Sequence, residues 1–297
     1  MQGKSVLVTG ASTGIGRACA LDLAARGARV FAGVRREADA HDLRAAAGPN
    51  LEPLLLDVTR PEQVEAAARA VGPRLWGLVN NAGVNISGPS EFLPIDQYRR
   101  QFEVNFFGQI AVTQVLLPAI REARGRVLFV GSAAGWIATP FQGPYSASKF
   151  ALEALADSLR MELAPWGIHV ALIKPGSIAT PIWERARSQA VDAMAGAPPE
   201  ALRFYEGAMR RMGAAALVIG GRGIAPDRVV AAVRHALTAP RPRTRYLVGR
   251  EALLARIGRF LPDRLRDAFI ARELDRLVAS PAGQAASAEL DHFRVDS

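Results

Sequence analysis

The sequence is poor in several residue types, and each shortage narrows the kind of protein that it encodes. Cys19 is the single cysteine among 297 residues, so no disulfide can form within the chain. It lies in a helical pattern, where a buried, small apolar side chain is expected. The four histidines are not spaced as metal ligands and have no cysteine beside them, so we expect no metal site.

Long apolar runs and a leader segment are also missing. No apolar run approaches the ~18 residues that a membrane span requires. The first residues, MQGK, lead directly into the strand-like SVLVTG, which leaves no room for a signal peptide. Hydrophobic residues make up 49% of the chain, as in a globular protein with an ample core. These observations predict a cytoplasmic protein.

Lysine is scarce, because it occurs only at Lys4, Lys149 and Lys174, and 34 of the 37 basic residues are therefore arginine. The formal net charge of +9 is of the kind found in nucleic-acid-binding proteins. The arginines are nevertheless scattered over surface-like helical positions, with no basic block and no interleaved aromatic residues. We therefore expect a compositional preference for arginine and no nucleic-acid partner.

From residue 4 to about 175, the sequence alternates short, nearly continuously apolar runs with longer helical segments. The strand-like runs are KSVLVTG, ARVFAGV, LEPLLLDV, RLWGLVNNAG, GRVLFVGS and GIHVALIKPG. Helix candidates include residues 14–26, 61–71, 96–121 and 145–163. Strands as apolar as these are covered on both faces, so the alternation predicts an α/β fold with a doubly wound parallel sheet. The carboxyl ends of its strands would form the ligand-binding edge.

The alternation ends near residue 180, which defines the expected domain organisation. Residues 180–222 mix helical turns with Gly and Pro, a composition typical of a mobile lid over a site. A helix near 226–238 and a strand in TRYLVG complete a single domain of residues 1–249. Residues 250–297 would form a helical C-terminal extension, with apolar residues at helical spacing between arginines. The apolar positions are Leu253, Leu254, Ile257, Phe260 and Leu261.

A glycine-rich turn, VTGASTGIGRA, follows the first strand. Gly10, Gly14 and Gly16 lack side chains, so the backbone can approach a phosphate closely. The helix that begins there offers free N–H groups and the positive end of its dipole. The spacing G-x-x-x-G-x-G differs from the commoner G-x-G-x-x-G. Its place between the first strand and a helix predicts a dinucleotide-binding turn.

The end of the second strand indicates which dinucleotide binds. Proteins that prefer NAD carry an Asp or Glu about 20 residues after the glycines, where it bonds the adenine ribose. Here Val34 ends the strand, and the guanidinium groups of Arg35 and Arg36 would attract a 2′-phosphate. The sequence therefore predicts NADP(H). Two solvated arginines would give the same pattern, and Glu37 would become the ribose acid if the strand ended later.

Tyr145 and Lys149 stand four residues apart in GPYSASKF, at the start of a helix, and Ser132 ends the preceding strand. Residues four apart share a helix face, so the phenol and the ammonium are neighbours. A tyrosine that exchanges protons at neutral pH needs a pKa lowered by roughly 3 units, and a nearby positive charge acts in that direction. The pattern predicts a proton-transfer site beside the cofactor, with Ser132 holding a substrate oxygen. A packed tyrosine and a surface lysine are the structural alternative.

These motifs occur together in an order that resembles the short-chain dehydrogenase/reductase family. The shared elements are TGASTGIG, NNAG at 80–83, Asn105, Ser132, YSASK and KPG at 174–176. The likeness covers roughly residues 4–240 and implies a Rossmann fold, a nicotinamide cofactor and oxidoreductase activity on CH–OH groups. The segments FAGVRR and RTRYLVGREALLARIGRFLPD look, more loosely, like members that act on hydroxysteroids and retinoids.

The resemblance implies a role for each catalytic residue. Tyr145 would be the general acid/base, and Lys149 would lower its pKa and bind the nicotinamide ribose. Ser132 would orient the substrate oxygen. Asn105 would hold a water that links Lys149 to solvent in a proton relay.

The resemblance also implies the cofactor-binding residues. Asp57, in LLLDVT, would bond the adenine amino group, and residues 175–180 would meet the nicotinamide carboxamide. Residues 80–83 would support the central strand and line the cofactor cleft. The full set is Gly10, Ser12, Thr13, Gly14, Ile15, Gly16, Arg35, Arg36, Asp57, Val58, Asn81, Ala82, Gly83, Tyr145, Lys149, Pro175, Gly176, Ile178 and Thr180.

The substrate pocket is expected between the segment after Ser132, the lid and parts of the tail, where apolar side chains predominate near the site. Candidate substrate residues are Ala134, Phe141 and Trp183. They favour a bulky lipophilic carbonyl or alcohol, such as a steroid or retinoid. A 3-oxoacyl thioester reductase and a non-catalytic NADP(H)-binding sensor are the alternatives, although a sensor has no need of the four catalytic residues.

Association is expected through two surfaces. Family members usually pair through the long helices, here 96–121 and 145–163, which predicts a homodimer or homotetramer. The basic amphipathic segment 250–277 either packs on the domain or on a partner subunit, or lies on an anionic membrane surface.

Overall fold

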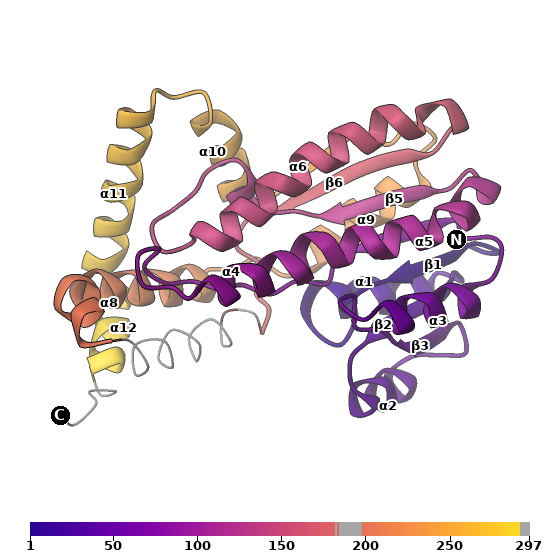
Figure 1. Cartoon of the computed structure of the whole chain (residues 1–297), viewed down its shortest axis with the longest axis horizontal. Coiled ribbons are helices and arrows are strands. Elements are labelled where there is room, and N and C mark those ends of the chain that lie inside the picture. Colours follow the sequence, from indigo (N-terminus) through magenta and orange to yellow (C-terminus); the bar gives the residue numbers. More distant parts are fainter. Residues whose placement is uncertain (182, 184–197, 292–297) are drawn as a thin grey trace.

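A seven-stranded parallel sheet forms the centre of the computed structural model, which describes residues 1–181, 183 and 198–291 (Figure 1). The strands are β1 (Ser5–Val8), β2 (Arg29–Val34), β3 (Leu51–Leu55), β4 (Gly77–Asn80), β5 (Arg126–Val130), β6 (His169–Pro175) and β7 (Arg245–Val248). Their order is β3-β2-β1-β4-β5-β6-β7, and neighbouring strands are parallel. The order reverses between β1 and β4, which confirms the predicted doubly wound fold. In such folds ligands bind at the carboxyl ends of the strands at this reversal.

Two layers of helices cover the sheet, because successive strand residues point to opposite faces. In β5, Leu128 and Val130 belong to the core on one face, and Val127 and Phe129 to the core on the other. The first face is covered by α1 (Gly14–Ala25), α2 (Glu37–Ala46) and α9 (Asp227–Thr238), and the second by α3 (Pro61–Val71), α5 (Gly108–Ala123) and α6 (Gly143–Leu163). Burial on both faces explains why the strands appear in the sequence as continuous apolar runs.

The helix expected at 96–121 is interrupted. It consists of α4 (Ile95–Phe102), a π-helical turn (Glu103–Phe107) and α5. Single π turns within helices are frequent at functional sites. Asn105 lies in this turn, so the interruption falls at one of the predicted catalytic residues.

Among the described residues, one helical stretch has the length and apolar composition of a membrane span. It runs from Ile95 to Ala123, and 39% of its most apolar window is buried inside the fold. Core helices of globular proteins have the same properties. The sequence alone does not single this stretch out, because Arg99, Arg100 and Glu103 interrupt its first turns.

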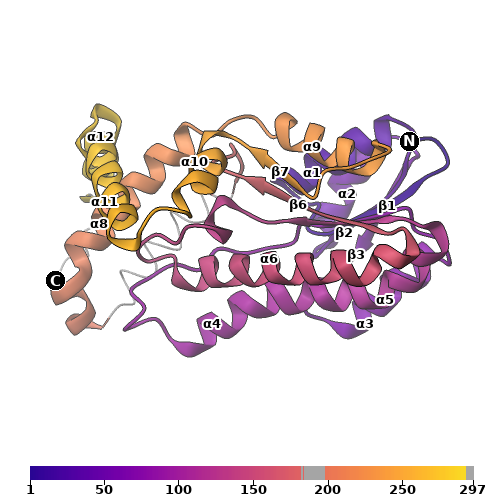
Figure 2. The same ribbon diagram turned by 90° about the horizontal axis from the view of Figure 1, so that it is seen from above.

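Three helices form what we term the C-terminal arm: α8 (Pro199–Gly221), α11 (Asp263–Ala279) and α12 (Pro281–Asp291). Both α11 and α12 pack on α8, and Figure 2 shows the three helices beyond one end of the sheet. A further helix, α10 (Arg250–Gly258), follows β7 and packs on β6, β7 and the turn after β5. The expected helical extension is therefore present.

The segment expected to be a lid is more regular than its composition indicates. Residues 199–221 form one helix of 23 residues, so the expectation of short turns with breakers is wrong for this part. Glycine weakens an isolated helix, but here Ala214 packs against Ala286 of α12 and stabilises α8 in tertiary context. Residues 182 and 184–197, also part of the expected lid, lie outside the described residues.

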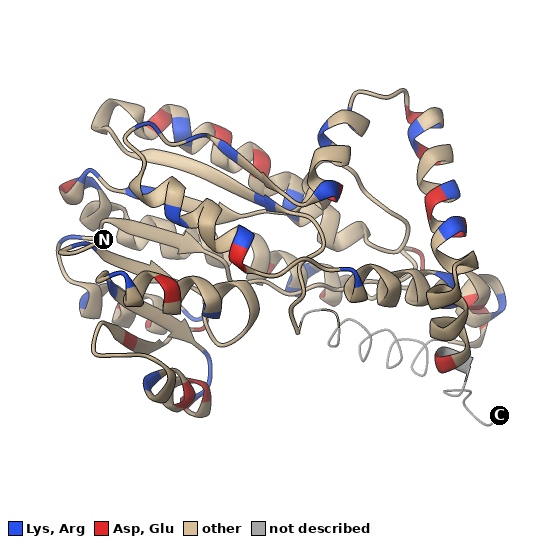
Figure 3. Cartoon of the chain, turned by 180° about the vertical axis from the view of Figure 1, so that it is seen from behind, with Lys and Arg blue, Asp and Glu red and all other residues tan. Residues whose placement is uncertain are grey.

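Basic and acidic residues are interspersed along the helices of the ribbon in Figure 3. Arginines pair with carboxylates three or four residues away, as Arg26 does with Asp22 and Arg210 with Glu206. This arrangement agrees with the scattered arginine positions in the sequence.

Candidate functional site

The glycine turn lies between the carboxyl ends of β1 and β4. Gly10 and Gly14 have φ angles of +64° and +57°, which favour glycine. A Cβ on Gly16 would lie 2.3 Å from the Gly10 carbonyl oxygen, and a Cβ on Gly10 would lie 2.8 Å from the Ala82 Cα. The backbone is therefore packed too closely for side chains at these positions. Together with Ser12, Thr13 and Ile15, these glycines form a cradle at the N-terminus of α1 that fits a dinucleotide phosphate.

Asn81 and Ala82 stabilise this turn from the neighbouring strand. The Asn81 side-chain amide donates to the carbonyls of Thr9 (3.0 Å) and Gly10 (3.1 Å). In return, the Thr9 hydroxyl accepts from the backbone N–H groups of Asn81 (2.9 Å) and Ala82 (3.0 Å). Thr9 thus connects the glycine turn after β1 to the segment after β4. The sequence analysis did not single out this residue. Gly83 follows Ala82. A Cβ on Gly83 would lie 3.3 Å from the Asn105 side-chain oxygen.

The two arginines after β2 have different surroundings. Arg36 forms a bidentate ion pair with Asp39, at 2.9 Å and 2.5 Å, and this carboxylate raises the pKa of Arg36. Arg35 is exposed, and no ion pair is described for it. Glu37 is the first residue of α2, three positions beyond the end of the strand. The pair Arg36–Asp39 leaves Arg35 as the better placed cation at the end of β2.

Asp57 and Val58 follow β3. The Asp57 carboxylate accepts hydrogen bonds from the backbone N–H (3.0 Å) and the hydroxyl (2.7 Å) of Thr59. Its backbone N–H donates to the Gln63 side chain at 2.7 Å. Val58 is buried against Gly108, the first residue of α5. These contacts fix the loop beside the glycine turn.

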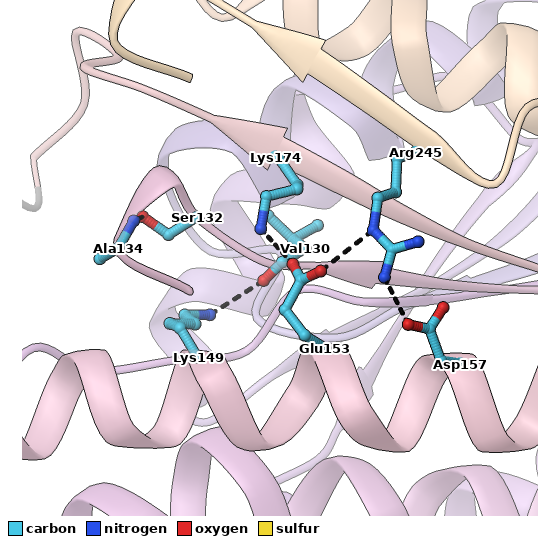
Figure 4. A network of polar contacts seen from close by, with 8 residues as sticks. All are labelled: Val130, Ser132, Ala134, Lys149, Glu153, Asp157, Lys174 and Arg245. Carbon is cyan, nitrogen blue, oxygen red and sulfur yellow. Dashed lines mark hydrogen bonds and ion pairs between the residues drawn. The ribbon is translucent and has the colours of Figure 1, made fainter. Parts of the chain in front are cut away.

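Ser132, Tyr145 and Lys149 converge at the carboxyl end of β5. Ser132 lies two residues after the strand, and its hydroxyl oxygen accepts from the Ala134 N–H at 3.1 Å. Tyr145 is in the first turn of α6 and hydrogen-bonds the Ser132 side chain. The Lys149 ammonium donates to the Val130 carbonyl at 2.9 Å (Figure 4). It lies 5.7 Å from the centre of the Tyr145 ring.

Burial dominates the electrostatics of this cluster. It raises the pKa of Tyr145 above its usual value, while the hydrogen bond from Ser132 acts in the opposite direction. Burial and the positive charge of Lys174 lower the pKa of Lys149 to about 8. In the protein alone, burial thus outweighs the effect of Ser132 on the pKa of Tyr145. The expectation that Lys149 lowers this pKa stays a prediction for the protein with its cofactor bound.

Asn105 is fully buried in the π turn. Its side-chain oxygen accepts from the Val84 N–H at 2.8 Å, and its amide donates to the Val84 carbonyl at 2.9 Å and to the Ser148 hydroxyl at 3.3 Å. The side chain thus connects the loop after β4 to α6. These bonds use both hydrogens of the amide and one of the two lone pairs of its oxygen.

Residues 175–180 form a loop that approaches the glycine turn. The Gly176 N–H donates to the Val248 carbonyl at 2.8 Å, and Ile178 forms a β-bridge with Ile224. The Thr180 side chain would lie 3.2 Å from a Cβ on Gly14. The two segments expected to hold opposite ends of the cofactor are thus brought together.

The three candidate substrate residues differ in their contacts. The backbone of Ala134 binds Ser132. Trp183 donates from its indole to the Ile178 carbonyl at 2.8 Å and packs on Gly220 of α8, so it connects the cofactor loop to the arm. Phe141 has a φ of +63°, an unusual conformation for a bulky residue that is often found at functional sites.

Phe141 belongs to an aromatic cluster that is centred on Tyr205. The Tyr205 ring of α8 lies 6.1 Å from the Phe141 ring and 5.9 Å from the Phe92 ring, both edge-on. The Tyr205 hydroxyl donates to the Glu91 carboxylate at 2.8 Å. The sequence analysis missed Phe92 and Tyr205 because they lie 49 and 64 residues from Phe141, with no local pattern to connect them.

No group of three or more histidine, cysteine or acidic side chains placed to hold a metal ion occurs among residues 1–181, 183 and 198–291. The groups that the structure brings together at the candidate site are a hydroxyl, a phenol, an ammonium and a glycine-rich turn.

Comparison with known proteins gives one family and several relatives. Residues 4–191 match the family described as short chain dehydrogenase. Retinol dehydrogenase 5 of Mus musculus is 38% identical over 283 residues, covering 91% of this chain and 89% of that protein. The NADPH-dependent 3-dehydrocapnine reductase of Ornithobacterium rhinotracheale is 36% identical over 282 residues, covering 91% and 97%. The crystal structure of a short-chain dehydrogenase from Streptomyces avermitilis superposes with a TM-score of 0.74 at 30% identity, covering 94% of this chain and 99% of that one.

Proposed function

Because the chain belongs to the short chain dehydrogenase family, we propose that it is an NADP(H)-dependent oxidoreductase that interconverts a carbonyl and an alcohol on a bulky lipophilic substrate. The membership confirms the resemblance predicted from the sequence, including the looser likeness to retinol dehydrogenases. One observation carries the proposal: Ser132, Tyr145 and Lys149 meet beside a glycine cradle at the carboxyl edge of the sheet.

When bound, NADP(H) supplies or accepts the hydride. In reduction, the Tyr145 phenol donates its proton to the carbonyl oxygen of the substrate, and the Ser132 hydroxyl hydrogen-bonds that oxygen. In oxidation, the Tyr145 phenolate removes the proton of the alcohol. Positioned proton transfer of this kind contributes about 10²–10⁴-fold to an enzymatic rate.

The raised pKa of Tyr145 suits one direction of this reaction. Burial keeps the phenol protonated, as a general acid for reduction requires. Oxidation requires the phenolate, which is stabilised by the Lys149 ammonium and by the positive charge of the oxidised nicotinamide. Lys149 would exchange its hydrogen bond to the Val130 carbonyl for one to the nicotinamide ribose. The position of its ammonium would then depend on the bound cofactor.

Asn105 contributes to the proton path through its backbone. Its side chain is occupied by Val84 and Ser148. A π turn displaces the backbone from the regular α-helical hydrogen-bond pattern. We place the relay water at the backbone carbonyl of this turn, on the side of Lys149.

Preference for NADP(H) rests on Arg35. A guanidinium binds a phosphate with charge-assisted hydrogen bonds, and no carboxylate follows β2 before α2 begins. Replacing Arg35 by alanine should therefore lower kcat/KM for NADPH by about 10- to 100-fold and leave the value for NADH unchanged. Arg36→Ala is the matched control, since its guanidinium is paired with Asp39. A wild-type preference for NADH, or equal effects of both substitutions, would contradict the assignment.

A lipophilic substrate is supported by the aromatic cluster around Phe141 and by the retinol dehydrogenase relative. NADPH consumption is measured with retinal, steroid ketones, aromatic ketones and 3-oxoacyl thioesters. We expect turnover of the first three classes. Activity restricted to the thioesters would favour an acyl thioester reductase, and NADPH binding without any turnover would favour a cofactor sensor.

Assembly and location complete the proposal. Apolar side chains on the helices α4 to α6 are exposed, as Ile95, Phe107 and Phe150 show, which supports pairing of two chains through these helices. We propose a cytoplasmic homodimer or homotetramer whose residues 250–277 contact a membrane surface weakly. Analytical ultracentrifugation and liposome co-sedimentation measure the two properties separately.

A further inference from the structure

A second buried lysine lies beside the catalytic cluster. Lys174, near the end of β6, has an exposed fraction of 0% and forms an ion pair with Glu153 of α6. Its ammonium also lies 3.8 Å from the centre of the Trp136 ring, a favourable position for a cation. A lysine is rarely buried this completely without a specific partner.

Glu153 is shared between two cations. Its other oxygen accepts from Arg245 of β7 at 3.1 Å, and Arg245 also donates to Asp157 at 2.6 Å. Asp157 accepts in addition from Arg160 at 3.1 Å. Two strands, β6 and β7, and the helix α6 thus bring together a chain of alternating charges, of which Lys174 is the end nearest the catalytic cluster (Figure 4).

The sheet places Lys174 next to Lys149. The Val130 carbonyl of β5 accepts the hydrogen bond from Lys149. Val130 pairs with Ile173 of β6, and Lys174 is the next residue of β6. Glu153 is one helical turn after Lys149 on α6. In Figure 4 the side chains of Lys149 and Glu153 both extend from α6 toward Val130 and Lys174.

We propose that Lys174 is a positioning residue whose ammonium, held by Glu153, sets the protonation of Lys149 and thereby the pH range in which Tyr145 exchanges its proton. This role rests on the proposed function, because it acts on the general acid/base through Lys149. The side-chain contacts described for Lys174 are with Glu153 and Trp136, not with Tyr145.

The signs of the charges support this role. Lys174 and Lys149 are like charges in a low-dielectric interior, so each disfavours protonation of the other. Burial and this repulsion lower the pKa of Lys149 to about 8, and burial lowers the pKa of Lys174 to about 8 despite the opposing effect of Glu153. A lysine with such a pKa can release and recover a proton near neutral pH.

Other charged groups that face Lys174 come from three elements. Glu153 of α6 raises its pKa, whereas Arg245 of β7 and Arg259, which follows α10, lower it. Glu251 of α10 also lies at this end of β6, but its carboxylate accepts from the Ser177 N–H at 3.5 Å. Among the residues that the structure describes, Glu153 is the one carboxylate paired directly with Lys174, and Glu153 is itself shared with Arg245.

The chain is well suited to a direct test, because it has only three lysines. The full-length protein is labelled with ¹³C at the lysine Cε, and the three signals are followed by NMR as the pH rises. Lys4→Arg and Lys174→Met assign two of them. In the unsubstituted protein, the Lys149 and Lys174 signals should titrate near pH 8 over a broadened range, because the two sites are coupled.

Lys174→Met should raise the pKa of Lys149 by about one pH unit, since it removes the like charge and keeps a long apolar side chain. Glu153 retains Arg245 in this variant, so no buried carboxylate loses its last partner. Arg160→Gln is the matched control at the far end of the network and should leave the Lys149 titration unchanged. An unchanged Lys149 titration in Lys174→Met would overturn the proposal. So would single-site titration of both lysines at the value of free lysine in the unsubstituted protein, a readout that needs no variant.

Activity gives an independent readout. The pH profile for carbonyl reduction should also shift in Lys174→Met, because the charge on Lys149 affects the ionisation of Tyr145. A purely structural role would lower the rate equally at every pH. Because the NMR titration needs neither substrate nor cofactor, it separates failure of this inference from failure of the proposed function.

Discussion

The sheet and the C-terminal arm hold their residues in different ways. Every residue of β5 is buried, and the core on both faces of the sheet is continuous. In α11, by contrast, no residue is buried, and Leu265 and Phe269 are largely exposed. The arm is held mainly by contacts among its own helices. The sheet therefore determines the fold and positions the candidate catalytic residues, whereas helix α11 of the arm leaves apolar side chains exposed to solvent.

This difference divides the candidate site into two parts. Ser132, Tyr145, Lys149 and the glycine turn lie at strand ends or in the first turns of the helices that follow, where packing fixes them. The arm contributes Tyr205, whose ring contacts Phe141 and Phe92 and whose hydroxyl binds Glu91. In the function that we propose, the residues at the edge of the sheet carry out the chemistry, and the arm takes part in recognising the substrate.

The largest effect is expected when one tyrosine hydroxyl is removed from each part of the candidate site. Tyr145→Phe should lower kcat by about 10²–10⁴-fold, because the general acid/base is lost, and leave NADPH affinity unchanged. Tyr205→Phe should change kcat for a small ketone by less than about fivefold and raise KM for a bulky substrate. Steady-state kinetics and NADPH titration measure both. Turnover retained in Tyr145→Phe would refute the catalytic assignment.

Truncating one phenylalanine in each part compares their stability. Phe129, in β5, is 0% exposed, and Phe269, in α11, is 48% exposed. Phe129→Ala should lower the free energy of unfolding by about 3–5 kcal/mol, since it leaves a cavity in the core. Phe269→Ala should cost less than about 1 kcal/mol. Chemical denaturation provides the values, and equal losses would show that the arm is as tightly packed as the sheet.

Much of the sheet can be predicted from the sequence, because its signals are local. The strands are continuous apolar runs, and the glycines of the turn after β1 indicate that the backbone is closely packed there. Parallel strands end at one edge, which is enough to bring Ser132, Tyr145 and Gly10 together without any tertiary information. The pairing of Arg36 with Asp39 is also local, and a spacing of three residues on a helix start could have revealed it.

Other features depend on contacts that no local pattern encodes. Lys174, Glu153 and Arg245 are separated by up to 92 residues, and they meet because β6 and β7 are adjacent and α6 packs on β6. The glycines of α8 indicate breaks, but packing on α12 overrides this preference. The pKa of Tyr145 depends on the balance between burial and charge, and burial cannot be read from the spacing of a tyrosine and a lysine.

The most direct test of the central claim is the ionisation of Tyr145 itself. The chain has four tyrosines, so the ultraviolet phenolate signal of Tyr145 is obtained by subtracting the titration of Tyr145→Phe from that of the wild type. In the protein alone, Tyr145 should ionise above the usual pH of a tyrosine, because burial raises its pKa. Addition of NADP⁺ should move this ionisation to markedly lower pH, as the cofactor and Lys149 together stabilise the phenolate. An ionisation of Tyr145 that is the same with and without NADP⁺ would contradict the account.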